Sequence, residues 1–168
     1  MSDFTLHIGD DGVAVITWDV KAKSMNVMST EAFQLLSDLV DEALANEAVK
    51  GIVITSGKKD FAAGMDLNVL AKMREGGAQS IFDGVMKMHK ILRKIELAGM
   101  DPKTKKGGKP IAAALPGTAL GIGFEVPLAC HRVFVADIQR LKSACPRLWS
   151  AFSPVRAAPR DWCVRWGP

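Results

Sequence analysis

Two short segments combine small residues with a place in the chain that leaves backbone N–H groups free. Residues 61–67 (FAAGMDL) follow a β-branched run and open a helical pattern, and residues 116–125 (PGTALGIGFE) again lead from an apolar run into a helix. The first N–H groups of a helix have no partner within it and lie at the positive end of its dipole, which suits an oxygen that gains negative charge. Small residues before a helix, as in the first segment, more often reflect ordinary tight packing, so this segment does not establish a site by itself.

Glu125 is the candidate catalytic carboxylate. It falls in the first turn of the second helical pattern, with Val126, Leu128 and Ala129 around it. A carboxylate placed beside a bound substrate can take up and give back a proton during a reaction. The alternative is that a negative charge simply sits favourably at a helix N-terminus, and the residues alone leave both interpretations open.

Other uses of these residue types fit the sequence less well. The glycines at 121 and 123 lack the third glycine of the dinucleotide fingerprint, and the chain has neither a G-K-[ST] phosphate loop nor an early βαβ unit. Three cysteines share no metal-ligand spacing, and their odd number argues against a disulfide framework. We interpret Cys130, Cys145 and Cys163 as thiols without a role.

The elements that must position these segments follow from hydrophobic periodicity and turn residues. The pattern predicts a β-hairpin (residues 4–9 and 12–18), a helix (30–44) and a strand buried on both faces (51–56). Two helices (66–73 and 78–98), an apolar strand (110–115), a helix (122–130) and a strand (132–136) are expected to follow. The order ββαβααβαβ is typical of a layered α/β domain. The polar segment 101–109 (DPKTKKGGK) is expected to be a surface loop.

Composition predicts one soluble domain. The 168 residues are 48% hydrophobic and 24% charged, and no signal peptide or membrane-length apolar run is present, so we expect a cytoplasmic protein without a membrane partner. The net charge of +4 comes from residues 138–168, which hold six basic residues and one acidic residue. We therefore expect no nucleic-acid partner, although a basic, tryptophan-containing C-terminal arm that binds nucleic acid is the competing interpretation of that segment.

Residues 1–137 resemble the crotonase (enoyl-CoA hydratase/isomerase) family. The resemblance is carried by FAAGMDL at 61–67 and GTALGIGFEVPLACH at 117–131, with Asn26 in SMNVM as a weaker third motif. The second motif is most similar to the hydratase region of multifunctional fatty-acid oxidation proteins. The resemblance implies an α/β fold, a truncated crotonase-like ββα spiral core. It also implies an acyl-CoA thioester substrate, no metal, and no cofactor beyond the substrate's own coenzyme A. Members of the family commonly form oligomers, which this truncated chain need not do.

The same resemblance assigns roles to individual positions. The two amides of the family's oxyanion hole correspond to the backbone N–H groups of Met65 and Ile122. Many members have glycine at the second position, so isoleucine there requires an ordinary, negative φ. Glu125 corresponds to the first of two hydratase glutamates. Substrate or CoA contacts are implied for Ala63, Gly64, Asp66 and Gly121.

Three functions are compatible with this assignment. The leading one is hydration of 2-enoyl-CoA thioesters in fatty-acid β-oxidation, in which two carboxylates position and split a water. An enoyl-CoA isomerase needs one carboxylate to move a proton. A non-catalytic fragment that binds acyl-CoA is the third.

The family pattern ends after Asp137. Where a second glutamate is expected, the chain has Arg147, and restoring one lost nucleotide ahead of codon 138 lets permitted codons spell the missing family segment. We therefore interpret residues 138–168 as a non-family tail produced by out-of-frame translation. The expected consequence is a hydratase that is impaired or inactive.

Overall fold

The computed structural model describes residues 2–21, 23–104, 106–136 and 163–165. The interpretation of residues 138–168 as a non-family tail, Arg147 included, lies outside the described residues apart from the backbone of 163–165. The elements in chain order are β1 (Phe4–Ile8), β2 (Val13–Trp18), α1 (Thr30–Ala45), β3 (Gly51–Ser56), α2 (Leu67–Glu75), α3 (Gly77–Leu97), β4 (Ile111–Leu115), α4 (Ile122–Ala129), β5 (Arg132–Val135) and β6 (Cys163–Arg165).

The predicted order ββαβααβαβ is confirmed from β1 to β5, with boundaries that differ by a residue or two. The strands form one six-stranded sheet in the order β1-β2-β3-β4-β5-β6. β1 and β2 are the antiparallel hairpin, and every later neighbouring pair is parallel. Parallel strands end at the same edge of a sheet, so the segments that leave β2, β3 and β4 begin side by side. Both candidate loops start at this edge.

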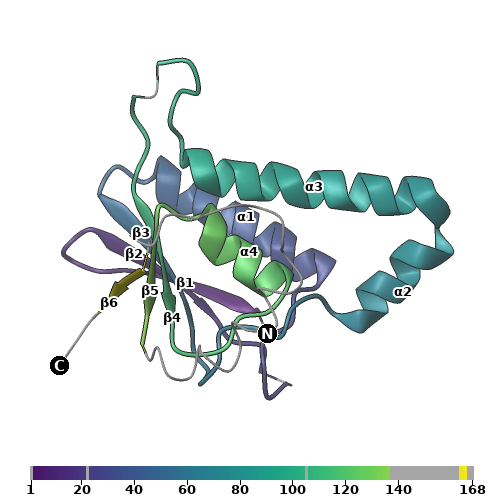
Figure 1. Ribbon diagram of the computed structural model, residues 1–168. Helices are drawn as coiled ribbons and strands as arrows, with labels where there is room; N and C mark the ends of the chain where they lie inside the picture. Colours follow the sequence, from purple (N-terminus) through teal and green to yellow (C-terminus); the bar gives the residue numbers. More distant parts are fainter. Residues whose placement is uncertain (1, 22, 105, 137–162, 166–168) are drawn as a thin grey trace.

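The helices cover one face of the sheet, with α1 and α4 against the strands and α3 crossing above them (Figure 1). Alternate residues of each strand face this layer, as the pleat requires. The fully buried positions include Ala14, Ile16, Trp18, Ile52, Ile54, Ile111, Ala113 and Leu115. α1 contributes Phe33, Leu36 and Val40 to the same core.

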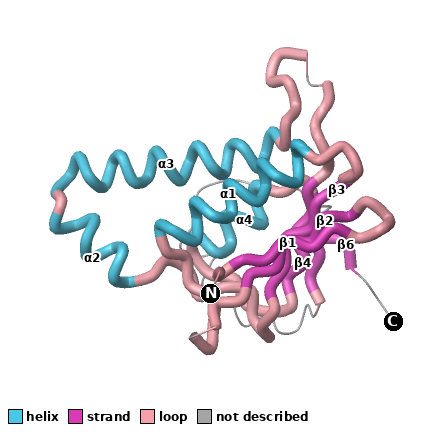
Figure 2. The backbone as a smooth tube through the Cα atoms, turned by 180° about the vertical axis from the view of Figure 1, so that it is seen from behind, coloured by secondary structure: helices cyan, strands magenta, loops and turns pink. Residues whose placement is uncertain are grey.

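The expectation that strand 51–56 is buried on both faces was wrong for the described part of the chain. Ile52 and Ile54 are buried, whereas Val53 and Thr55 on the opposite face are only half-buried. The reason is that the described helices lie on one side of the sheet only, as the view from behind also shows (Figure 2). A continuous apolar run is compatible with either arrangement.

α2 and α3 form an arm that reaches beyond the sheet (Figures 1 and 2). The two helices meet at Gly76 and Gly77, and their outer surface includes the exposed side chains of Leu67, Leu70 and Phe82. Within the described ranges, no helix is both long and apolar enough to cross a membrane.

Candidate functional site

The two predicted loops lie against each other at the carboxyl edge of the sheet. Ala62 and Ala119 form an isolated parallel bridge, and the Leu120 N–H donates to the Ala62 carbonyl at 3.0 Å. The glycines beyond this bridge also approach closely. A Cβ added to Gly64 would lie 3.3 Å from the Leu120 carbonyl oxygen, and one added to Gly121 would lie 3.9 Å from Gly64 Cα. The structure therefore brings together two segments that are far apart in the sequence.

The N–H group of Met65 is free of protein partners in the described part of the chain. Residues 64–66 run parallel to Met28, whose N–H donates to the Gly64 carbonyl at 2.8 Å and whose carbonyl accepts from the Asp66 N–H at 2.9 Å. These two bonds use the carbonyl of Gly64 and the N–H of Asp66, the residues on either side of Met65. Because neighbouring residues of an extended segment turn their backbone groups to opposite sides, the Met65 N–H faces away from Met28.

The N–H group of Ile122 is likewise without a partner among residues 2–136 that the structure describes. Ile122 is the first residue of α4, and the next three N–H groups donate to the carbonyls of Leu120 and Gly121. Ile122 has the negative φ that an isoleucine requires at this position, because Ala98 is the only described non-glycine residue with a positive φ. The strained angles fall on the glycines instead, with φ of 107° at Gly64 and 51° at Gly121.

Glu125 lies one helical turn after Ile122 in the first turn of α4. Residues three apart on a helix are neighbours on its surface, so the carboxylate is on the same side of α4 as Ile122. Its side chain is half-buried, and among the described residues it has neither an ion pair nor a hydrogen bond. It remains available to a ligand.

The four positions predicted to contact substrate or CoA are not equivalent. Ala63 and Gly121 are exposed residues, while Gly64 is buried between the loops. Asp66 has a structural task, because its side chain caps α2 by accepting from the Asn68 N–H at 2.9 Å and pairs with Lys23 at 2.5 Å. These hydrogen bonds, from Lys23 first and then from the Asn68 backbone, hold the pKa of Asp66 below its ordinary value.

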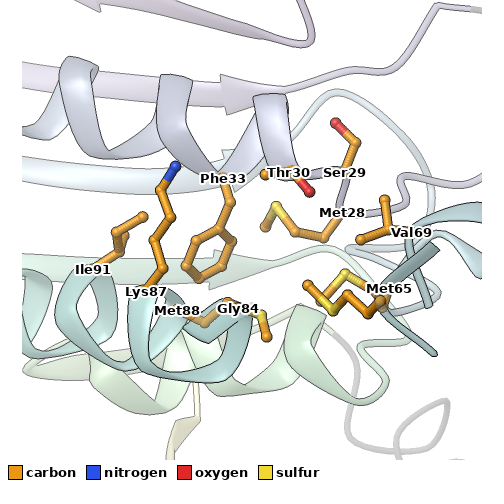
Figure 3. Close-up of a pocket in the computed structure, with 11 residues that line it drawn as sticks. Met28, Ser29, Thr30, Phe33, Met65, Val69, Gly84, Lys87, Met88 and Ile91 are labelled. Carbon is orange, nitrogen blue, oxygen red and sulfur yellow. The ribbon is translucent and has the colours of Figure 1, made fainter. Parts of the chain in front are cut away.

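An apolar cavity of about 40 Å³ opens beside the first loop, between α1, α2 and α3. Met65 reaches into it from the loop, and Phe33, Lys87 and Ile91 lie around its far end (Figure 3). Four of its eleven lining residues are methionines, namely Met28, Met65, Met73 and Met88. Sequence reasoning missed this cavity, although methionines on neighbouring elements are a known feature of adaptable binding surfaces.

A second, more polar groove of about 340 Å³ adjoins the cavity. The two share Ser29, Thr30, Val69 and Met73 in their walls. Asp66, Asn68, Lys72 and Ser80 give the groove its polar character. An extended ligand could place an apolar end in the cavity and a polar end in the groove.

Cys130 is the one cysteine whose side chain the structure describes. It is buried directly after the last residue of α4, and its thiol donates to the Val126 carbonyl at 3.3 Å. Burial raises its pKa to about 12, so it stays protonated and unreactive at neutral pH. Cys145 and the side chain of Cys163 lie outside the described residues.

Comparisons with known proteins agree with this geometry. The family model described as enoyl-CoA hydratase/isomerase matches residues 9–148. The fatty acid oxidation complex subunit alpha of Shewanella halifaxensis is 34% identical over 132 residues, which are 77% of this chain and 17% of that protein. Its counterpart in Shewanella oneidensis is 28% identical over 152 residues, or 90% of this chain and 20% of that protein.

The fold is similar to that of an enoyl-CoA hydratase from Shewanella pealeana, with a TM-score of 0.69 at 15% identity over 79% of this chain and 46% of that one. The chain thus spans about a fifth of the length of the curated relatives and about half of the solved structure. The family match covers both candidate loops, α4 and Glu125. The chain belongs to the enoyl-CoA hydratase/isomerase (crotonase) family.

Proposed function

We propose that this chain binds an acyl-CoA thioester and stabilises negative charge on its carbonyl oxygen with the N–H groups of Met65 and Ile122. The observation that carries the proposal is a pair of amides on two adjoining loops, neither of which has a partner among the described residues. Preorganised donors of this kind contribute roughly 3–4 kcal/mol each in comparable sites. The N-terminal end of α4 adds a favourable dipole at the same point.

The reaction that we propose is hydration of a 2-enoyl-CoA, as in fatty-acid β-oxidation. The hydroxyl group of water adds to C3 and a proton adds to C2, while the thioester carbonyl passes through an enolate that the two amides stabilise. Glu125 is the acid/base group for this transfer. The chemistry uses amides and carboxylates and calls on no metal or redox cofactor. Because the resemblance to the family places Arg147 where a second glutamate is expected, we expect hydration by this chain to be impaired or absent.

A single assigned carboxylate also suits the isomerase reaction, in which one base removes a proton from C2 of a 3-enoyl-CoA and returns it to C4. Product analysis with 2-enoyl-CoA and 3-enoyl-CoA substrates separates the two reactions. Hydration gives a 3-hydroxyacyl-CoA, and isomerisation gives a 2-enoyl-CoA. Binding of acyl-CoA without either product would leave the chain as a binding fragment.

The cavity beside Met65 is the proposed place for the carbon chain of the acyl group. A thioester whose carbonyl oxygen faces the Met65 N–H has its carbon chain next to the methionine-lined wall. The cavity is small, with a volume of about 40 Å³. We therefore propose short acyl chains as the substrates, for which the flexible methionine side chains make room.

Filling the cavity tests this placement. A Cβ at Gly84 would meet Met73 Cε at 2.7 Å, the flexible end of a side chain that also lines the cavity. We expect Gly84→Leu to weaken the binding of butenoyl-CoA by about tenfold or more, since about 1.4 kcal/mol of lost contact is a tenfold change, and to leave the binding of CoA alone unchanged. Isothermal titration measures both affinities. Ala78→Leu, at an exposed position of α3, is the control, and equal affinities in the two variants would place the carbon chain elsewhere.

The thioester proposal is tested by difference infrared spectroscopy of butenoyl-CoA labelled with ¹³C at the carbonyl. Hydrogen bonds from both amides should move the carbonyl stretch to lower wavenumber than in water. A bound thioester whose band stays at its aqueous position would overturn the proposed oxyanion site. Absence of binding would overturn the acyl-CoA assignment altogether.

A further inference from the structure

Asn26 is one of two fully buried polar side chains in the described part of the chain, and it sits where two parallel strands end. Its amide nitrogen contacts the carbonyl oxygens of Trp18 and Phe61 at 3.0 Å each and Ser56 Oγ at 2.9 Å. Its amide oxygen accepts from the Val20 N–H at 3.0 Å. One side chain thus joins the end of β2, the end of β3 and the start of the first loop.

The backbone of the same segment continues this connection along the loop. The Asn26 carbonyl accepts from the Ala63 N–H at 2.8 Å, two residues before Met65. Met28 then makes the two backbone bonds to Gly64 and Asp66 that turn the Met65 N–H outward. The loop is therefore held along its length by residues 26–28, and Asn26 fixes where that segment lies relative to the sheet.

We propose that Asn26 is the positioning residue of the oxyanion site, acting through residues 61–64 to set the direction of the Met65 N–H. This inference rests on the proposed thioester site and adds to it a residue that does not touch the substrate. A misplacement of about 1 Å in such a site can cost roughly 10²-fold in rate. The position of the loop therefore matters to the reaction as much as the presence of the amide.

The amide side chain suits this role for a reason that no close substitute shares. Its two N–H donors are shared among three oxygens and its oxygen accepts from the Val20 N–H, so every polar atom of this fully buried side chain has a partner. Asn26→Asp keeps the shape but places a carboxylate oxygen against the carbonyls of Trp18 and Phe61, which repel it. The loop should respond by moving away from the strand ends.

The test uses the full chain and ¹³C-labelled butenoyl-CoA. Asn26→Asp should reduce the shift of the thioester carbonyl band and lower the rate of C2 proton exchange in bound butanoyl-CoA by about 10²-fold with little change in affinity. It should also speed amide hydrogen exchange at Ala63 while Ile16 in β2 stays protected. Asn46→Asp is the matched control, because Asn46 is exposed and, of its side-chain atoms, only the oxygen makes a hydrogen bond, which it accepts from the Ala48 N–H. An aspartate can accept the same bond. The control should behave like the unchanged protein.

Ser56→Ala keeps the inference testable if Asn26→Asp does not fold. It removes one of the three acceptors of the Asn26 nitrogen and should give the same changes at smaller size. If a folded Asn26→Asp or Ser56→Ala protein keeps the unchanged protein's carbonyl band and Ala63 exchange rate, the positioning role is wrong while the thioester site stands. If the unchanged protein itself does not shift the band, the proposed function fails first and the role of Asn26 fails with it.

Discussion

Replacing Glu125 by glutamine should lower the rate of proton transfer at C2 of a bound acyl-CoA by about 10²–10⁴-fold, with affinity nearly unchanged. Glutamine keeps the size and hydrogen-bonding capacity of the side chain but can neither take nor give the proton. Glu125 is half-buried, and its side chain makes no hydrogen bond or ion pair with the described residues, so the substitution breaks none of either. The loss should therefore appear in the chemical step alone.

Exchange of the C2 protons of butanoyl-CoA in D₂O, followed by NMR, measures this step even where hydration is slow. Glu47→Gln, at an exposed loop position, serves as the control and should exchange at the rate of the unchanged protein. Undiminished exchange in Glu125→Gln would show that another group is the base. It would also return Glu125 to the simpler role of a favourable charge at a helix N-terminus.

Replacing Gly64 by alanine should reduce the same rate by about 10²-fold or more, the loss expected when one oxyanion donor is displaced. Gly64 has φ of 107°, and an added Cβ would lie 3.3 Å from the Leu120 carbonyl oxygen. Alanine must relax that angle or push the second loop away, and either movement turns the Met65 N–H out of line. The thioester carbonyl band should return toward its position in water.

Gly77→Ala separates backbone strain from the site. Gly77 also has a positive φ, 75°, but no atom lies within 4 Å of an added Cβ at the junction of α2 and α3. Both variants should lose some stability, which thermal unfolding measures, and only Gly64→Ala should lose the spectroscopic signature. Equal catalytic loss in the two variants would mean that general destabilisation, rather than the oxyanion site, is responsible.

The order of the elements was predictable because each one buries a single face whose spacing is visible in the sequence. α1 shows this well, since Phe33, Leu36 and Val40 recur at helical intervals and all three are buried. The degree of burial of β3 was not predictable, because a run such as GIVITS carries the same residues whether one or both faces are covered. What lies over a strand is a property of the whole chain.

The candidate site, like the fold, was predictable only in the features that local sequence determines. The two glycine-bearing loops and Glu125 could be named from their residues, and their assignment to one site came from a resemblance to a family. Their contact depends on parallel strands that end together, which no local pattern contains. The cavity was missed because its methionines come from separate elements. Asn26 was noticed only as part of a weak motif, since a single buried asparagine becomes meaningful when its four partners are known.

Both proposed donors are main-chain amides, and this affects how such a protein can change during evolution. A substitution at Met65 or Ile122 alters the neighbouring wall and leaves an N–H in place, so the chemical capability is inherited through the path of the backbone. Selection is then free to vary the side chains that meet the ligand's carbon chain. The sequence around the loops can then drift far without loss of the donors, provided that the path of the backbone is kept.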